Sequence, residues 1–250
     1  MTRPAPRLKV DAPLDTGAEI ALERAQTHYL LHVLRLGAGA EVRLFNGRDG
    51  EWRAVIEAAG KRGATLRAEA SIRPQAAPTP LVLVFAPLKK DAMDFLVAKA
   101  TELGATELRP VLTERTETRR INIERIHTQL TEASEQCERL EVPTIAEPVA
   151  LAEFLAHWPA ESPLWCGDET SGGEPFAAAL GSLARDAGNP HGILIGPEGG
   201  FTEGELARLA GLAFVRRIDL GPRILRAETA ALAALACWQA LSGDPRRLNQ

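Results

Sequence analysis

The sequence predicts an α/β protein with a parallel sheet, preceded by a small domain of antiparallel strands. Downstream of Pro80, apolar runs of strand length alternate with amphipathic segments of helix length, which is typical of a parallel sheet. Upstream, short segments alternate apolar with charged residues between glycine turns, which is typical of antiparallel strands. The proline-rich stretch IRPQAAPTP, residues 72–80, separates the two patterns. We therefore expect two domains.

The N-terminal part, residues 1–73, is predicted to form a small β-barrel. Strands are expected at residues 41–47, 51–59 and 64–72, joined by an Asn-Gly turn and a glycine-rich turn. Residues 1–77 carry 12 Lys and Arg against 9 Asp and Glu, although the whole chain has a net charge of −4. A basic N-terminal third suggests localised contact with a polyanion, and a solvated surface would also explain so small an excess. Prolines favour extended chain, so residues 74–80 are predicted to be a linker.

The second predicted domain, residues 81–250, begins with the continuous apolar run LVLVFAPL, typical of a strand covered on both faces. The next segment places five apolar residues on one helical stripe that ends at Gly104. Further strands are expected at residues 108–112, 163–167, 193–196 and 215–221, and further helices at 123–130, 176–184, 202–210 and 227–241. Thr202 and Glu205 have the spacing of a capping box, which predicts where the helix at 202–210 begins.

Two glycine-marked segments are the best candidates for a ligand site: ILIGPEGGFTEGE, residues 193–205, and IDLGPRILRAETA, residues 218–230. Each has a buried strand that runs into a Gly-Pro turn and then a helix, so both turns are expected at the same edge of the sheet, where open α/β sheets bind ligands. Either segment alone could be a plain turn. Together they bring Gly196, Gly199, Gly200 and Gly221, which expose backbone polar groups, near Glu198, Arg226 and Glu228.

Other site classes lack their patterns. No GxGxxG follows the first strand of the second domain, and Phe201 and Thr202 stand where a P-loop needs Lys and Ser or Thr. The cysteines (Cys137, Cys166, Cys237) and the five histidines show no metal-ligand spacing, so we expect reduced thiols and no metal. No apolar run approaches the roughly 20 residues of a membrane span, and residues 1–10 lack the apolar core of a signal peptide. We therefore expect a cytoplasmic protein that makes no membrane contact.

The pair GPEGGF and LGPRILRAETA resembles the signature of the 16S ribosomal RNA uridine-N3 methyltransferases, a branch of the SPOUT superfamily. The resemblance extends to LKKDAMDFLVAKATELGATELRPVLTERT, residues 88–116, and to EASEQCER, residues 132–139. HYLLHVLRLGAG, residues 28–39, resembles the start of the PUA-like domain that precedes the catalytic domain in this family. Cys137 and Thr116 depart from the family pattern, in which serine is usual at both positions.

This resemblance implies a SPOUT-type parallel sheet with a C-terminal trefoil knot, preceded by a PUA-like RNA-binding β-barrel. It also implies a homodimer and methylation of N3 of a specific uridine in 16S rRNA, within the assembled small ribosomal subunit, with S-adenosylmethionine as cofactor. The knotted loops match residues 164–170, 195–200 and 218–226. The cofactor-binding residues implied are Leu164, Cys166, Gly167, Ile195, Gly196, Pro197, Gly199, Gly200, Leu220, Gly221, Ile224 and Leu225.

Uridine N3 must lose a proton, and a cation near O2 and O4 would stabilise the resulting anion. Arg226 is the leading candidate for that cation and Arg223 the second; the alternative for Arg226 is a salt bridge to Glu228 or a contact at a helix N-terminus. Glu198 or Glu228 could accept the proton, directly or through water, if burial raises its pKa. Glu198 could instead anchor its turn by binding backbone N–H groups. The residues expected to contact RNA are Lys89, Lys90, Lys99, Arg115, Arg119 and Arg223.

Two questions stay open at this level. Glu135, Gln136 and Arg139 share a helix face and could meet the partner's pocket or make structural hydrogen bonds. The alternative function is that of a ribosome-assembly protein that binds RNA without catalysis. The paired glycine turns argue against it, because a decayed site has no physical need to keep them.

Overall fold

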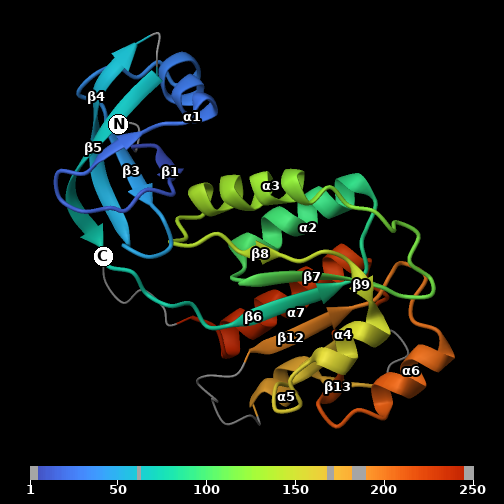
Figure 1. The fold of residues 1–250 in the computed structure, drawn as a ribbon. Coiled ribbons are helices and arrows are strands. Elements are labelled where there is room, and N and C mark those ends of the chain that lie inside the picture. Colours follow the sequence, from blue (N-terminus) through green and yellow to red (C-terminus); the bar gives the residue numbers. More distant parts are fainter. Residues whose placement is uncertain (1–4, 61–62, 168–171, 182–189, 245–250) are drawn as a thin grey trace. The chain divides into compact units, whose positions relative to one another are not determined.

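The computed structural model describes residues 5–60, 63–167, 172–181 and 190–244 of the chain. The chain divides into two compact units (Figure 1). The first comprises Met1–Ala77 together with Ser134–Val142, and the second comprises Pro78–Ala133 together with Pro143–Gln250.

The first unit is built on a five-stranded sheet with the order β1-β3-β4-β5-β2. Its strands are β1 Arg7–Lys9, β2 Glu19–Ala21, β3 Glu41–Phe45, β4 Glu51–Gly60 and β5 Gly63–Arg73. Strands β3, β4, β5 and β2 pair antiparallel, as the two-residue period predicted, whereas β1 runs parallel to β3. Apolar side chains at alternate strand positions, among them Leu44, Ile56 and Leu66, form the core of this unit.

Several elements of the first unit were not predicted from the sequence. These are the short strands β1 and β2, the helix α1 Arg24–His28, and the π-helical turn Tyr29–Val33 that follows it. Strands of three residues carry too little periodicity to be recognised, and they form because a longer neighbour supplies hydrogen bonds. Over the described residues the strand pairing runs from β1 to β2 and does not join these two edges, so closure into a barrel stays a prediction.

The segment Ser134–Val142 packs within the first unit, although the sequence placed it in the second domain. Its anchor is Arg7, which is 8% exposed and forms an ion pair with the buried Glu51. The Arg7 guanidinium also donates hydrogen bonds to the carbonyl oxygens of Ser134 at 2.9 Å, Glu135 at 2.9 Å and Arg139 at 2.7 Å. A cation on the last carbonyls of a helix satisfies groups that have no partner within the helix.

Two of the three residues predicted to share a helix face make structural contacts, and Arg139 lies beyond the last residue of the helix, Gln136. The Glu135 carboxylate accepts a hydrogen bond from the backbone N–H of Lys9 at 3.0 Å, and Arg139 pairs with Glu141 at 2.8 Å. Glu135 and Lys9 are more than 100 positions apart in the chain, so the sequence pattern could not predict their contact.

Replacing Arg7 by methionine is expected to lower the free energy of unfolding of the first unit by about 3 kcal/mol, because it leaves the buried Glu51 carboxylate without its main partner. Arg73, 3.5 Å from the other Glu51 oxygen, can offset only part of this loss. Hydrogen exchange of the backbone amides of β3, β4 and β5 in increasing urea, which reports on the first unit, measures the change. The exposed Arg24→Met is the matched control. A loss below about 1 kcal/mol, as for an exposed ion pair, would contradict the expectation.

The second unit contains an eight-stranded sheet in which every described strand pair is parallel, so the predicted parallel sheet is confirmed. The strand order is β11-β13-β10-β12-β6-β7-β8, and β9 pairs with β7. The strands are β6 Leu81–Phe85, β7 Glu107–Leu112, β8 Thr144–Ile145, β9 Val149–Ala150, β10 Leu164–Gly167, β11 Glu174–Pro175, β12 His191–Ile195 and β13 Val215–Asp219. The helices are α2 Lys90–Glu102, α3 Ile123–Gln136 (its residues up to Ala133), α4 Leu151–His157, α5 Phe176–Gly181, α6 Glu203–Ala210 and α7 Ala227–Leu241.

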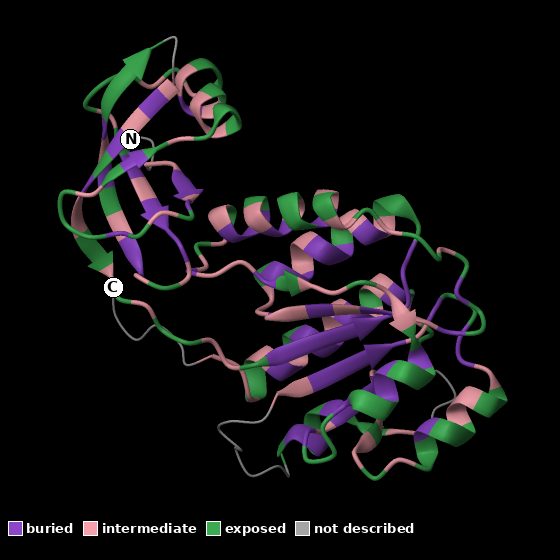
Figure 2. Cartoon of the chain, in the orientation of Figure 1, coloured by how far each residue is buried: buried purple, intermediate pink, exposed green. Residues whose placement is uncertain are grey.

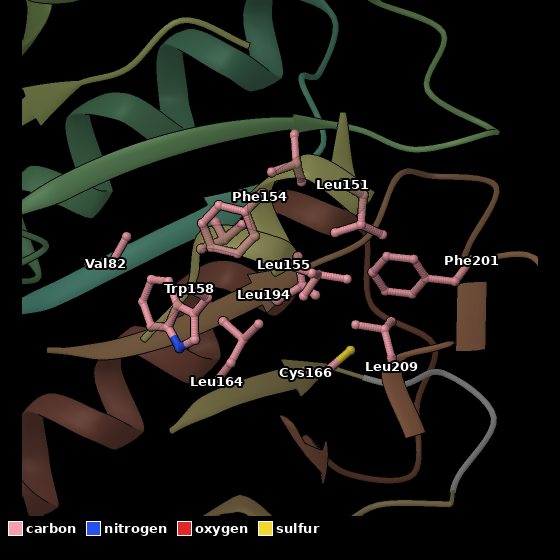
Figure 3. Packing of buried hydrophobic residues seen from close by; sticks show 12 residues of the cluster. Val82, Leu151, Phe154, Leu155, Trp158, Leu164, Cys166, Leu194, Phe201 and Leu209 are labelled. Atoms are coloured by element: carbon pink, nitrogen blue, oxygen red, sulfur yellow. The ribbon is translucent and has the colours of Figure 1, made fainter. Parts of the chain in front are cut away.

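Helices cover both faces of this sheet, and β6 and β12 are buried almost throughout (Figure 2). On one face, side chains of the central strands pack against α4 and α6; this cluster includes Val82, Leu164, Cys166, Leu194, Phe154, Trp158 and Leu209 (Figure 3). The alternate residues of the same strands face the other way, where Trp165 contacts Phe176 of α5 and His191 contacts Trp238 of α7. Because all strands run parallel, their carboxyl ends meet at one edge.

Candidate functional site

A cavity of about 290 Å³ lies at the carboxyl edge of the sheet, where β10, β12 and β13 end. Its volume is near the lower end of the roughly 300–1,000 Å³ range of small-molecule sites. The two glycine-marked turns form most of its wall, so they open on the same edge, as the sequence predicted. The lining residues are Gly167, Ile195, Gly196, Pro197, Glu198, Gly200, Phe201, Leu206, Ile218, Asp219, Leu220, Gly221, Pro222, Arg223, Ile224, Leu225, Arg226, Ala227 and Ala230.

The turn after β12 needs glycine at two positions. The backbone N–H of Gly200 donates to the carbonyl oxygen of Pro197 at 2.9 Å, and Gly200 has φ of 68°, which disfavours residues with a Cβ. A Cβ at Gly196 would come within 2.9 Å of the Phe201 ring. The capping box is confirmed at the start of α6: Glu205 N–H donates to Thr202 Oγ1 at 3.2 Å, and Thr202 N–H donates to Glu205 Oε2 at 2.9 Å.

The turn after β13 is set by Asp219 and Gly221. The Asp219 carboxylate accepts a hydrogen bond from the backbone N–H of Gly221 at 2.9 Å, and Gly221 has φ of 112°. Arg226 occupies the N-cap position of α7, and its carbonyl oxygen accepts the first hydrogen bond of that helix, from Ala230. Asp219 was not predicted as a site residue; an Asp two residues before a glycine is a turn signal that could have indicated it.

Two arginines at the cavity have no charged partner among the described residues. Arg223 and Arg226 are both exposed, and within the described residues neither guanidinium forms an ion pair or hydrogen bond. The salt bridge considered for Arg226 and Glu228 is therefore not formed. Glu228 is half-buried and lies outside the cavity lining, whereas Glu198 is exposed and lines the cavity. Among the described contacts, Glu198 accepts no hydrogen bond from a backbone N–H, so the anchoring role considered for it is not observed there.

Lys89 lies at the same edge, immediately before α2. The Lys89 ammonium group forms an ion pair with the Glu117 carboxylate at 3.1 Å. This contact raises the pKa of Lys89 above its usual value, and Glu198 makes a smaller contribution. Lys89 therefore stays protonated and can act as a cation but not as a base. The backbone N–H of Ala86 donates to the carbonyl oxygen of Ile195 at 3.1 Å, which places the loop after β6 beside the turn after β12.

The structure separates several predicted site residues from the cavity. Leu164 and Cys166 are buried in the core between the sheet and α4, because their side chains point to the opposite face from Trp165. Gly199 is not part of the lining, and a Cβ there would contact Arg115 at 3.6 Å. Residues 168–170 of the predicted loop lie outside the described residues.

The predicted RNA-contact residues are also dispersed. Lys99 pairs with Glu102 at 2.7 Å near the C-terminal end of α2, about two and a half helical turns from Lys90. Lys90 and Arg119 are exposed. Arg115 donates a hydrogen bond to the carbonyl oxygen of Gly199 at 2.7 Å. RNA contact by these residues stays a prediction.

Apolar side chains that the sequence analysis did not assign to the site complete the cavity. Leu206 comes from α6, and Ala227 and Ala230 come from the first turn of α7. Ala227 and Ala230 are three positions apart and so share a helix face, a spacing that was visible in the sequence. Within the described residues no cluster of His, Cys, Asp and Glu could hold a metal ion. None of the described helices combines the length and apolar composition of a transmembrane span.

Each of the two parts of the chain matches the model of a known protein family. Residues 75–239 match the family model of an RNA methyltransferase domain, and residues 22–69 match that of an RNA methyltransferase PUA domain. The first match covers the sheet that carries the cavity, and the second covers most of the five-stranded sheet.

Individual relatives agree with these matches. The chain is 34% identical over 231 residues to ribosomal RNA small subunit methyltransferase E of Rickettsia conorii, covering 92% of this chain and 93% of the relative. It is 35% identical over 228 residues to the protein of that name from Synechocystis, covering 90% and 74%. A crystal structure of the Neisseria gonorrhoeae methyltransferase E bound to S-adenosyl methionine aligns with a TM-score of 0.86 at 28% identity, covering 96% of this chain and 98% of that one. The chain therefore belongs to the RNA methyltransferase family that includes the ribosomal RNA small subunit methyltransferase E proteins.

Proposed function

We propose that this protein uses S-adenosylmethionine to methylate N3 of a specific uridine in 16S rRNA, within the assembled small ribosomal subunit. The observation that carries the proposal is the cavity at the sheet edge, enclosed by two glycine turns and bordered by two arginines with no partner among the described residues. The relative from Neisseria gonorrhoeae, whose structure is bound to S-adenosyl methionine, supports the choice of cofactor.

The lining of the cavity suits this cofactor. Apolar side chains of Leu220, Leu225 and Ala230 match a flat adenine ring, and backbone groups of the glycine turns can bind its polar edges and the ribose. Glu198, on the cavity wall, would attract the positively charged sulfonium of the bound cofactor. When bound, the cofactor supplies an electrophilic methyl group.

The chain's own residues provide the rest of the chemistry. Removing the N3 proton leaves negative charge on uridine O2 and O4, and Arg226 or Arg223 can stabilise that charge because neither is neutralised by a neighbour in the described structure. Of the two candidate proton acceptors, Glu198 lines the cavity and Glu228 does not, so we assign the proton to Glu198. Holding uridine N3 close to the methyl group supplies much of the remaining rate enhancement.

The proposal includes a homodimer, a cytoplasmic location, a trefoil knot in the second unit and RNA binding by the PUA-like unit, whose sheet we expect to close into a barrel. The side chain of Ile224, 87% exposed beside the cavity, supports the homodimer, because a large apolar residue at a site edge is readily covered by a second subunit. Family membership supports the knot and the RNA-binding role.

Primer extension on 16S rRNA from cells with and without this protein tests the function. A methyl group on N3 blocks the Watson–Crick edge, so we expect reverse transcriptase to stop at one uridine only when the protein is present. Restoring the gene with Arg226→Ala, which removes the proposed charge stabilisation, should restore little of the stop. An unchanged stop pattern in cells lacking the protein would contradict the proposal and favour a ribosome-assembly protein without catalysis.

A further inference from the structure

The turn that follows β7, residues 113–116 with the sequence TERT, is fixed by its own buried hydroxyl groups. Thr113 and Thr116 are both buried, and their hydroxyl oxygens lie 2.9 Å apart. The backbone N–H of Thr113 donates to Thr116 Oγ1 at 2.8 Å, and the N–H of Thr116 donates to the Thr113 carbonyl oxygen at 3.3 Å. This TERT turn holds Glu114 and Arg115 on its exposed side.

Arg115 connects the TERT turn to the cavity loop, residues 196–202. Its Nη1 donates to the carbonyl oxygen of Gly199 at 2.7 Å and lies 3.5 Å from that of Phe201. The Gly199 carbonyl and the Gly200 N–H belong to one peptide group, and that N–H is bound to Pro197 at 2.9 Å. The peptide is therefore held at both ends and cannot rotate without losing two hydrogen bonds.

Glu205 makes a second connection between the same two segments. Its Oε1 accepts a hydrogen bond from the backbone N–H of Glu114 at 2.9 Å, while Oε2 accepts one from Thr202 at 2.9 Å. The capping carboxylate of α6 thus also binds the TERT turn. Arg115 and Glu205 together fix the cavity loop at Gly199 and at Thr202, on both sides of Gly200 and Phe201, which line the cavity.

We propose that Arg115 and Glu205 are positioning residues for the cofactor cavity, although neither lines it. They order the glycine loop before the ligand arrives, so the entropy of ordering the loop is not lost on binding. This inference rests on the proposed function, because it assumes that the cavity binds S-adenosylmethionine. It gives Arg115 a role different from the RNA contact that the sequence predicts.

The two roles have different measurable consequences. An arginine that binds a phosphate contributes to RNA affinity and to its salt dependence, and its loss leaves cofactor affinity unchanged. An arginine that orders the cavity loop contributes to cofactor affinity, and its loss leaves the salt dependence of RNA binding unchanged. A general loss of fold would lower the unfolding temperature and affect both.

Calorimetric titration of the full chain with S-adenosylmethionine, together with filter binding of 16S rRNA at several salt concentrations, separates these cases. Arg115→Met is expected to raise the Kd for S-adenosylmethionine about 10-fold, as loss of a charge-assisted hydrogen bond does. Arg115→Lys should recover part of the affinity, since it keeps one donor for Gly199 but loses the planar fork. Arg208→Met, at an exposed arginine of α6, is the charge-matched control and should leave the cofactor Kd unchanged.

Wild-type cofactor affinity in Arg115→Met, combined with weaker and less salt-dependent RNA binding, would overturn the inference and restore Arg115 as an RNA contact. If Arg115→Met does not fold, the Glu205→Gln variant tests the inference instead, because the glutamine amide keeps only one of the two acceptor oxygens. An unchanged cofactor Kd in Glu205→Gln would also overturn the inference. Failure of the wild-type chain itself to bind S-adenosylmethionine would instead refute the proposed function.

Discussion

Replacing Arg226 by alanine is expected to lower kcat by about 10²–10³ and to leave cofactor affinity near that of the wild type. A preorganised cation that meets the uridine anion acts mainly in the transition state, so its loss reduces the rate of the chemical step rather than binding. The structure supports a clean test: Arg226 is exposed and has no side-chain partner among the described residues, so its removal breaks no structural contact there. Arg226→Lys should recover only part of the rate.

Single-turnover methylation with saturating cofactor and ribosomal substrate isolates the effect of Arg226 on the chemical step. Arg223→Ala is the informative comparison, because Arg223 lines the same cavity and is also exposed. We expect the larger loss at Arg226. A normal single-turnover rate in Arg226→Ala would assign that residue to docking and would transfer the electrostatic role to Arg223.

Replacing Ala230 by phenylalanine is expected to abolish cofactor binding. Ala230 lies in the first turn of α7 and lines the cavity. The cavity volume of about 290 Å³ leaves no room for both a phenylalanine ring and S-adenosylmethionine. Phenylalanine is acceptable in a helix, so the fold should be retained. Gly199 is unsuitable for such a test, because a side chain there would contact Arg115 outside the cavity.

Calorimetry measures binding in the Ala230→Phe variant, and far-UV circular dichroism checks its helix content. Ala236→Phe is the matched control, because Ala236 lies in the same helix, is exposed and does not line the cavity. We expect normal binding in the control. Undiminished binding in Ala230→Phe would show that the cofactor site lies elsewhere.

Elements with strong periodicity were predictable from the sequence. The helix expected at residues 227–241 is α7 Ala227–Leu241, and the strands expected at 51–59 and 64–72 are β4 Glu51–Gly60 and β5 Gly63–Arg73. The capping box at Thr202 and the glycine at 104, with φ of 90°, marked helix boundaries correctly. Local signals of this kind depend on residues three or four positions apart, which the sequence displays directly.

Short elements could not be predicted in the same way. Strands β8, β9 and β11 have two residues each, and α4 Leu151–His157 follows β9 without a side-chain cap. Their conformation depends on neighbours distant in the chain: β8 and β9 pair with β7, and α4 covers the apolar face of the sheet. Such elements are stabilised by tertiary pairing rather than by their own propensity.

By itself, the sequence determined the parallel sheet, the two glycine turns at its carboxyl edge and the family of the protein, because hydrophobic period and turn chemistry are local properties. The tertiary structure alone decided which side chains face the cavity. In the fold, the side chains of Leu164 and Cys166 pack in the core, and Arg115 binds the carbonyl oxygen of Gly199. Residues 134–142 pack in the first unit, where Arg7 binds Ser134. These outcomes depend on strand order and on contacts between residues 84 to 132 positions apart, and no local pattern specifies such partners.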